Sequence, residues 1–236
     1  MFDIFLYLCK SLFFTVLKIT AMRRLGLISL FIVAFALGCT DHNSDDKPIV
    51  GANGEVVVKL NPTIADNDII DTFGDGCRMG VYVVNYKGDK PLGIAAKGNQ
   101  VDNAAFVYSS TNDSWRSESE VYFRDDKTKV DIIAYSPYKQ INDISNLYFC
   151  VAGDQTQSVE SSILMWCRER GDIPTAEGVD IELSPLVAGI EVHLTEGSGW
   201  SEGEWQSATK GVVVMNTQRE SYLNVVSGTL RLAESS

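Results

Sequence analysis

Short runs rich in β-branched and aromatic residues recur along most of this chain, and clusters of Gly, Asn, Asp and Pro separate them. Runs of this length and composition predict β-strands, and the clusters between them predict turns. The expected strands lie at 55–60, 80–84, 105–108, 130–135, 180–183, 190–195, 211–215 and 229–232. Many short strands at regular spacing indicate an all-β sandwich.

Two of the runs, 180–183 and 190–195, alternate strictly between apolar and polar residues. Successive side chains of a strand point to opposite faces, so this alternation predicts strands with one buried and one solvated face. One segment departs from the pattern. Residues 160–167 are expected to form a short helix capped by Ser158, because the apolar residues of this segment fall on one side of a helix.

A targeting signal precedes the strands. Residues 22–24 read Met-Arg-Arg, and an unbroken apolar run, 25–37, leads from them to a Gly-Cys pair that ends at Cys39. A basic flank, a short apolar core and a small residue before the break are the parts of a secretory signal, and the cysteine adds a lipid anchor. Residues 1–38 are therefore predicted to be a signal region with Met22 as the true start.

The residues before Met22 admit a second interpretation, in which 1–37 form a transmembrane hairpin. Asp3, Lys10 and Lys18 interrupt the apolar stretch. A charge near the middle of a bilayer costs about 2.5 to 3.5 kcal/mol on insertion scales, which favours the signal over the hairpin.

Lipid on Cys39, with palmitate among the acyl chains, would hold the protein at the outer membrane, because several chains together make anchoring stable. Residues 39–52 are polar and acidic and are expected to form a tether. The acidic run 44–46 resembles signals that send such lipoproteins to the cell surface, although a solvated tether explains it equally well. Residues 53–236 are expected to hold one β-sandwich.

The composition excludes several classes of function. The net charge of −11 disfavours binding to nucleic acid, because an acidic surface repels phosphate. After Cys39 the remaining cysteines are Cys77, Cys150 and Cys167, an odd number without C-x-x-C spacing. This pattern indicates neither a disulfide framework nor a zinc site, so the three cysteines are expected to be small core residues.

Candidate catalytic and metal sites are few. His42 falls in the tether, and His193 falls on the polar face of an expected strand, which indicates a surface residue rather than a catalytic base. The acidic stretch 66–71 resembles a calcium loop but lacks its glycine and its distal glutamate, so it is expected to be a connecting loop. We expect no enzyme activity, no cofactor and no metal, and a glycosidase remains only a remote alternative.

Tryptophans suggest a binding hypothesis. Trp200 and Trp205 lie in a glycine-rich stretch of loop character, where exposed rings could stack on the apolar face of a sugar. Packing in the core or in a hairpin is the competing interpretation of this pair. Trp115 and Trp166 are expected to fill the core.

Arg170, Gly171 and Asp172 spell a tripeptide that some host adhesion receptors recognise, and they follow the expected helix. A three-residue motif is weak evidence in a chain of this length, and chance explains it better. We keep these residues as a candidate receptor motif.

Four stretches resemble the fimbrillin family, which supplies the shaft, tip and anchor subunits of type V pili in Gram-negative anaerobes. They lie at 73–83, 103–123, 130–138 and 149–167. The most specific is V-D-I-I-A-Y-S-P-Y at 130–138, which is similar to the family pattern V-x-I-x-A-Y-Y-P-Y. Their order along the chain carries the resemblance.

The resemblance implies a transthyretin-like Greek-key β-sandwich with one short helix, corresponding to the N-terminal domain of a fimbrillin. The second domain of the family is expected to be absent. Family members are often trimmed by an arginine-specific protease and accept a strand from the next subunit, and Arg78 is the candidate trimming site here.

These observations predict a lipoprotein of the cell surface that acts as a structural, anchor or adhesion-associated subunit of a fimbrium. Its expected partners are the outer membrane, through the lipid on Cys39, and other fimbrial subunits, through β-strand addition. A host receptor or a glycan is a further candidate partner. The alternative function is a glycan-binding lipoprotein of the cell surface.

Overall fold

The computed structural model describes residues 55–65, 70–155, 159–175, 177–190 and 192–233. The predicted signal region, Cys39 and the tether lie outside these residues, as do Ser158 and positions 66–69 of the acidic loop. The described residues all belong to one compact unit. None of the helices within these ranges has the length and hydrophobicity that crossing a membrane requires.

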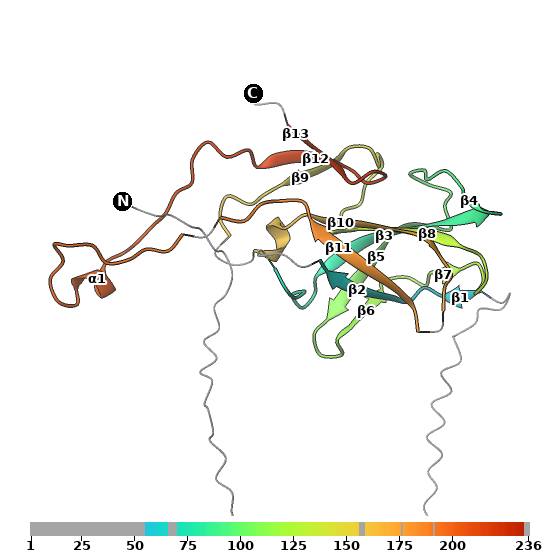
Figure 1. The fold of residues 1–236 in the computed structure, drawn as a ribbon, viewed down its shortest axis with the longest axis horizontal. Coiled ribbons are helices and arrows are strands. Elements are labelled where there is room, and N and C mark those ends of the chain that lie inside the picture. The colour runs from blue at the N-terminus through green and yellow to red at the C-terminus, as the bar shows by residue number, and fades with distance from the viewer. Residues whose placement is uncertain (1–54, 66–69, 156–158, 176, 191, 234–236) are drawn as a thin grey trace, which may run out of the picture. The chain divides into compact units, whose positions relative to one another are not determined.

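Strands dominate the described residues (Figure 1). They are β1 Val56–Val57, β2 Leu60–Ile64, β3 Arg78–Lys87, β4 Lys90–Pro91, β5 Val101–Ser109, β6 Ser114–Ser117, β7 Tyr122–Phe123, β8 Val130–Ser136, β9 Leu147–Cys150, β10 Met165–Asp172, β11 Val179–Pro185, β12 Glu220–Asn224 and β13 Thr229–Leu232, with the short helices η1 Glu160–Ser162 and α1 Glu204–Ser207. The prediction of an all-β fold is confirmed.

The largest sheet has the strand order β2-β11-β10-β8-β3-β5-β6, and β4 pairs with β3. Apart from the two-residue strands β4 and β7, strands β3, β5 and β6 follow one another as antiparallel neighbours, and β8 then pairs with the other side of β3. Three consecutive strands with a fourth beside the first make a Greek key. The Greek-key element of the predicted sandwich is therefore present.

Strand β8 is the centre of this sheet, and all seven of its residues are buried. Side chains alternate across a strand, so both faces of β8 must be covered. Ile132 and Ala134 contribute to one apolar cluster, the inner core. Ile133 and Tyr135 contribute to another, the outer core, on the opposite face. The run of β-branched and aromatic residues that predicted this strand is apolar except for Asp131, in keeping with burial on both sides.

The inner core is closed by the curling of the large sheet. Its end strands β2 and β6 contact each other, and the small β1–β7 pair adds Val56 and Phe123 to the same cluster. The predicted strand 55–60 is split in two, because the chain leaves its partner β7 after Val57 and pairs in parallel with β11 from Leu60.

The outer core is covered by a second sheet with the order β13-β12-β9 (Figure 1). Leu147, Phe149 and Leu223 point from this sheet into the outer core and are almost fully buried. Trp166 packs against the same cluster and donates its indole N–H to the carbonyl of Val225 at 2.7 Å. The covering sheet leaves its own outward face open.

The helix predicted at 160–167 is wrong. Only Glu160–Ser162 form a single 3-10 turn, and strand β10 begins at Met165. Ile163 and Leu164 precede strand β10, and Met165 to Cys167 are its first residues and pair with β8. A short apolar run of this kind has the same sequence pattern in a helix and in a buried strand.

The strands predicted at 190–195 and 211–215 are also wrong. The described residues of both segments have no strand partner, and Ile190, Leu194 and Val213 are 46%, 45% and 83% exposed. Their sequence suits a strand, but a strand also needs a neighbour for its backbone groups and an apolar surface for its side chains. The described part of the fold supplies neither.

Candidate functional site

The connection between β11 and β12 carries the predicted tryptophan pair. Within it, Ser201 binds the Glu204 carboxylate through its amide at 3.0 Å and its hydroxyl at 2.8 Å, which holds the turn that leads into α1. These hydrogen bonds, the amide first, lower the pKa of Glu204. The turn brings Trp200 and Trp205 together, with ring centroids 5.3 Å apart and planes at 73°.

The tryptophan pair is exposed enough to meet a ligand. Trp200 is 41% exposed and Trp205 is half-buried. Lys210 stands over the Trp205 ring, with its amine 4.5 Å from the centroid. Neither ring belongs to the inner or the outer core, so the pair packs on itself and leaves Trp200 as the more accessible stacking surface.

The other two tryptophans fill the core as predicted. Trp115 is 9% exposed and belongs to the inner core, where it packs edge-on against Phe73 at 4.9 Å. Trp166 packs against the outer core. They are therefore separate in the fold from the Trp200–Trp205 pair.

The tripeptide Arg170-Gly171-Asp172 ends strand β10 at a register shift against β8. Gly171 has a φ of +70°, in the left-handed region that favours glycine. Its amide donates to a carboxylate oxygen of Asp131 at 3.1 Å. Arg170 is exposed, whereas Asp172 is half-buried, and burial raises its pKa. This geometry gives Gly171 a role in the strand bulge.

Asp131 is the feature that sequence reasoning missed. It is 0% exposed in the middle of β8, and its carboxylate accepts hydrogen bonds from Arg168 at 2.8 Å and from the Tyr86 hydroxyl at 2.7 Å. Burial acts to raise the pKa of Asp131, but the hydrogen bonds from Arg168, Tyr86 and Gly171 outweigh it, so the pKa is lowered. A lone aspartate inside an apolar strand is the sequence signal for such a buried pair.

Arg78, the candidate trimming site, is the first residue of β3 and pairs with Val107 of β5. Its guanidinium forms an ion pair with Glu118 and lies 4.9 Å from the Tyr138 ring centroid. Its carbonyl accepts the Tyr138 amide at 2.8 Å. A protease would therefore have to release the start of a paired strand to reach this bond.

The remaining candidates are His193, a possible metal site and the three cysteines. His193 is exposed, as predicted, although it lies in an irregular segment rather than on a strand. Within the described ranges, no group of three or more His, Cys, Asp and Glu side chains is placed to hold a metal ion. Cys167 is buried in the inner core, and Cys77 and Cys150 are half-buried, all three as free thiols.

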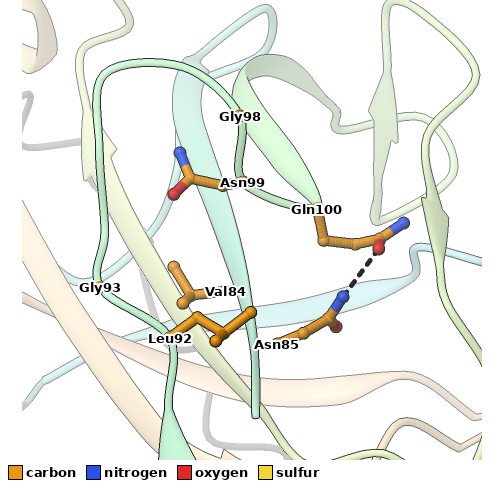
Figure 2. A pocket seen from close by; sticks show the side chains of 7 residues that line it. All are labelled: Val84, Asn85, Leu92, Gly93, Gly98, Asn99 and Gln100. Carbon is orange, nitrogen blue, oxygen red and sulfur yellow. Dashed lines mark hydrogen bonds between the residues drawn. The ribbon is translucent and has the colours of Figure 1, made fainter. Parts of the chain in front are cut away.

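A hollow of about 170 Å³ lies where the loop after β4 passes the edge of β3 (Figure 2). Asn85 donates to Gln100 at 2.8 Å, and Gln100 donates to the carbonyl of Tyr122 at 3.0 Å. Asn99 donates to the carbonyl of Ala95 at 2.7 Å. These amides bind one another and the backbone, and of the buried side-chain polar atoms in the lining only Asn85 Oδ1 has no partner among the described residues.

A second, wider hollow of about 260 Å³ lies over the outward face of the β13-β12-β9 sheet. Tyr222 and Arg231 are among its lining residues. Sequence reasoning did not identify it, because β9 and β12 were not among the expected strands.

The sequence model of the Fimbrillin-like family matches residues 64–236. A solved structure of a proposed cell adhesion protein from Bacteroides uniformis is 20% identical, with a TM-score of 0.49, and the match covers 79% of this chain and 68% of that one. A second proposed cell adhesion protein, from Bacteroides ovatus, is 15% identical, with a TM-score of 0.48 and coverage of 78% and 69%.

A fimbrial protein from Bacteroides ovatus is similar over 57% of this chain and 28% of its own length, with 17% identity and a TM-score of 0.35. The comparison with curated proteins finds no significant match. The family match spans well over half of the sequence, and the protein therefore belongs to the Fimbrillin-like family.

Proposed function

We propose that the protein is a cell-surface lipoprotein that serves as a structural, anchor or adhesion-associated subunit of a fimbrium. The observation that carries this proposal is the Fimbrillin-like match over residues 64–236. Membership of this family implies a cell-surface location and assembly with other fimbrial subunits. It also favours a structural role over an enzymatic one.

The proposed membrane anchor is lipid on Cys39. Its support is the order of a basic flank, an apolar run and a Gly-Cys pair in the sequence. In cells that make the protein, we expect radioactive palmitate to label it and the outer-membrane fraction to retain it. Cys39→Ser should abolish the label and release the protein from the membrane. Equal labelling of both forms would refute the anchor.

The proposed contact with other subunits is β-strand addition. Exposure alternates along residues 212–215. Val212 and Val214 are each 38% exposed, whereas Val213 and Met215 are 83% and 75% exposed. This alternation fits an extended segment that has no strand partner among the described residues. The backbone of such an apolar segment can form hydrogen bonds with a strand of another subunit. The outer edge of β13 is a second free edge among the described strands.

Co-purification of fimbrial subunits from these cells tests this contact. Val213→Pro removes the backbone donor of residue 213, whereas Val213→Thr keeps it and the β-branched shape. We expect the proline variant to lose its subunit partners and the threonine variant to keep them. Retention of partners by both variants would exclude this segment as the contact. Intact mass of the extracted protein also shows whether trimming occurs at Arg78.

The alternative function, glycan binding, rests on the exposed ring of Trp200 beside Trp205. Retention on immobilised polysaccharide that Trp200→Ala and Trp205→Ala both abolish would favour it. Absence of retention favours the purely structural role. A host receptor at Arg170–Asp172 would show as cell attachment that Asp172→Glu removes.

A further inference from the structure

The outward face of the small sheet carries a row of side chains that the outer core does not use. Along β12, Ser221 and Leu223 are buried beneath the sheet, so Tyr222 and Asn224 point the opposite way. The register places Tyr148 of β9 and Arg231 of β13 directly beside Tyr222, one on each side. The row therefore crosses all three strands.

The row is organised by ring contacts. The Tyr148 and Tyr222 ring centroids are 5.6 Å apart, with planes inclined at 59°. The Arg231 guanidinium stands 4.6 Å from the Tyr222 centroid and reaches the Asn146 side-chain oxygen at 3.4 Å. These contacts fix the Tyr222 ring and the N–H donors of the Arg231 guanidinium in the lining of the same hollow.

The hollow measures about 260 Å³, close to the lower end of the roughly 300–1,000 Å³ typical of ligand sites. Its lining consists of one aromatic ring together with hydroxyl, amide and guanidinium groups, from Ser145, Tyr222, Asn224, Ser227, Thr229 and Arg231. One small ring with several polar substituents matches both this volume and this chemistry.

Several polar groups of the hollow remain open. The Asn224 oxygen accepts the amides of Val226 at 3.0 Å and Ser227 at 3.2 Å, which fixes the orientation of its side chain. Its NH₂ group makes no hydrogen bond to a described residue and is a free donor. Arg231 has five N–H donors, and Asn146 uses one of them.

We propose that this hollow binds one pyranose ring of a carbohydrate. The apolar C–H face of the sugar contacts the exposed part of the half-buried Tyr222 ring, beside the Arg231 guanidinium that lies over the ring, and its hydroxyls accept hydrogen bonds from Asn224 and Arg231. A phosphate ligand fits less well, because Arg231 is the one cation in the lining and the chain carries a net charge of −11. The inference does not depend on the lipid anchor, on fimbrial assembly or on the Trp200–Trp205 pair.

Ligand-observed saturation-transfer NMR on the purified protein tests the proposal, with methyl α-D-mannopyranoside, methyl β-D-galactopyranoside and N-acetylglucosamine as probes. We expect at least one probe to bind with a dissociation constant on the order of 1 mM. Absence of transfer to all three probes would overturn the proposal.

Two variants locate the site. Asn224→Asp keeps the oxygen that holds the turn but removes the NH₂ donor, so we expect about tenfold weaker binding. Tyr222→Ala removes the ring and should abolish transfer. Asn216→Asp adds the same charge at an exposed position outside the hollow and should bind like the original protein.

Circular dichroism establishes that each variant is folded. If Tyr222→Ala does not fold, the Asn224→Asp measurement still decides the question, because that variant retains both turn hydrogen bonds. Unchanged binding by Asn224→Asp would overturn the proposal. The Trp200→Ala, Trp205→Ala double variant should bind normally, and loss of binding in it would move the sugar to the tryptophan pair and overturn the site proposed here.

Discussion

The buried ion pair between Asp131 and Arg168 supplies a strong test of how the sheet is held together. The Asp131 side chain is 0% exposed and that of Arg168 is 14% exposed, with 2.8 Å between their charged atoms. Tyr86 and Gly171 donate to the same carboxylate. Asp131→Ala therefore leaves a largely buried guanidinium and two further donors without their acceptor.

The expected loss follows from that burial. Removing one partner of a buried, hydrogen-bonded pair costs about 3 to 5 kcal/mol of the free energy of unfolding. For a domain of this size, each kcal/mol lowers the melting temperature by about 2 to 4 °C, so the melting temperature should fall by about 6 to 20 °C. Replacing both residues, as in Asp131→Leu with Arg168→Leu, should restore much of this loss because no buried charge remains.

Urea denaturation measures the free energy of unfolding, and an exposed pair serves as the matched control. Lys129 and Asp89 lie 3.3 Å apart, with side chains 45% and 93% exposed. Asp89→Ala should cost less than about 1 kcal/mol, because solvent screens such pairs. If Asp131→Ala and Asp89→Ala cost the same, the reasoning about burial is refuted.

The pH dependence of stability offers an independent check. The pKa of Asp131 is lower in the folded protein than its usual value, so its contribution is fully present above the pKa of the unfolded chain. It is lost as the pH falls below about 4 and through the folded pKa. Asp131→Asn should flatten this part of the acid limb. An acid limb that keeps its slope in the variant would contradict the assignment.

Three further predictions concern packing. Gly228→Ala places a Cβ 2.5 Å from the Trp166 ring at a φ of +71°, so we expect a loss of about 1 to 3 kcal/mol in urea denaturation, and an unchanged midpoint would show that the ring can move away. Burial raises the pKa of Cys167 to about 12, so iodoacetamide at pH 8 should label it only after unfolding, as peptide mass spectrometry would show, and labelling of the folded protein would contradict its burial. Leu147→Ala should cost about 2 to 5 kcal/mol, whereas Leu92→Ala, at a half-exposed position, should cost far less, and equal costs would contradict the outer core.

Individual strands were predictable where the residue pattern of the segment itself is typical of a buried or half-buried strand. Strand β8 was expected at 130–135 because this short run is rich in β-branched and aromatic residues, and β11 was expected because its residues alternate. The sheets themselves were not predictable. The start of β10 was predicted as the end of a helix, since its pairing with the distant strand β8 leaves no local signal in the sequence.

The candidate sites also differ in whether the sequence could predict them. The proximity of Trp200 and Trp205 could be expected, because few residues separate them within the same loop. The buried Asp131 pair and the Tyr148-Tyr222-Arg231 row could not, because each depends on strand register rather than on spacing along the chain. A site made of cross-strand neighbours becomes visible only when the pairing is known.

The segments 190–195 and 211–215 have sequences that are typical of strands, but their described residues do not form strands. The apolar residues of 190–195 alternate with polar ones and those of 211–215 are consecutive, and both patterns suit a strand, yet the described residues of the two segments form no strand and several of their apolar side chains are exposed. Backbone groups in such a segment bind water, and its apolar side chains gain nothing until a surface covers them. The stability of the sandwich therefore does not depend on these segments, whereas a partner strand that covers them would gain both hydrogen bonds and apolar burial. This difference is why we place a subunit contact at 211–215 rather than on the buried strands of the large sheet.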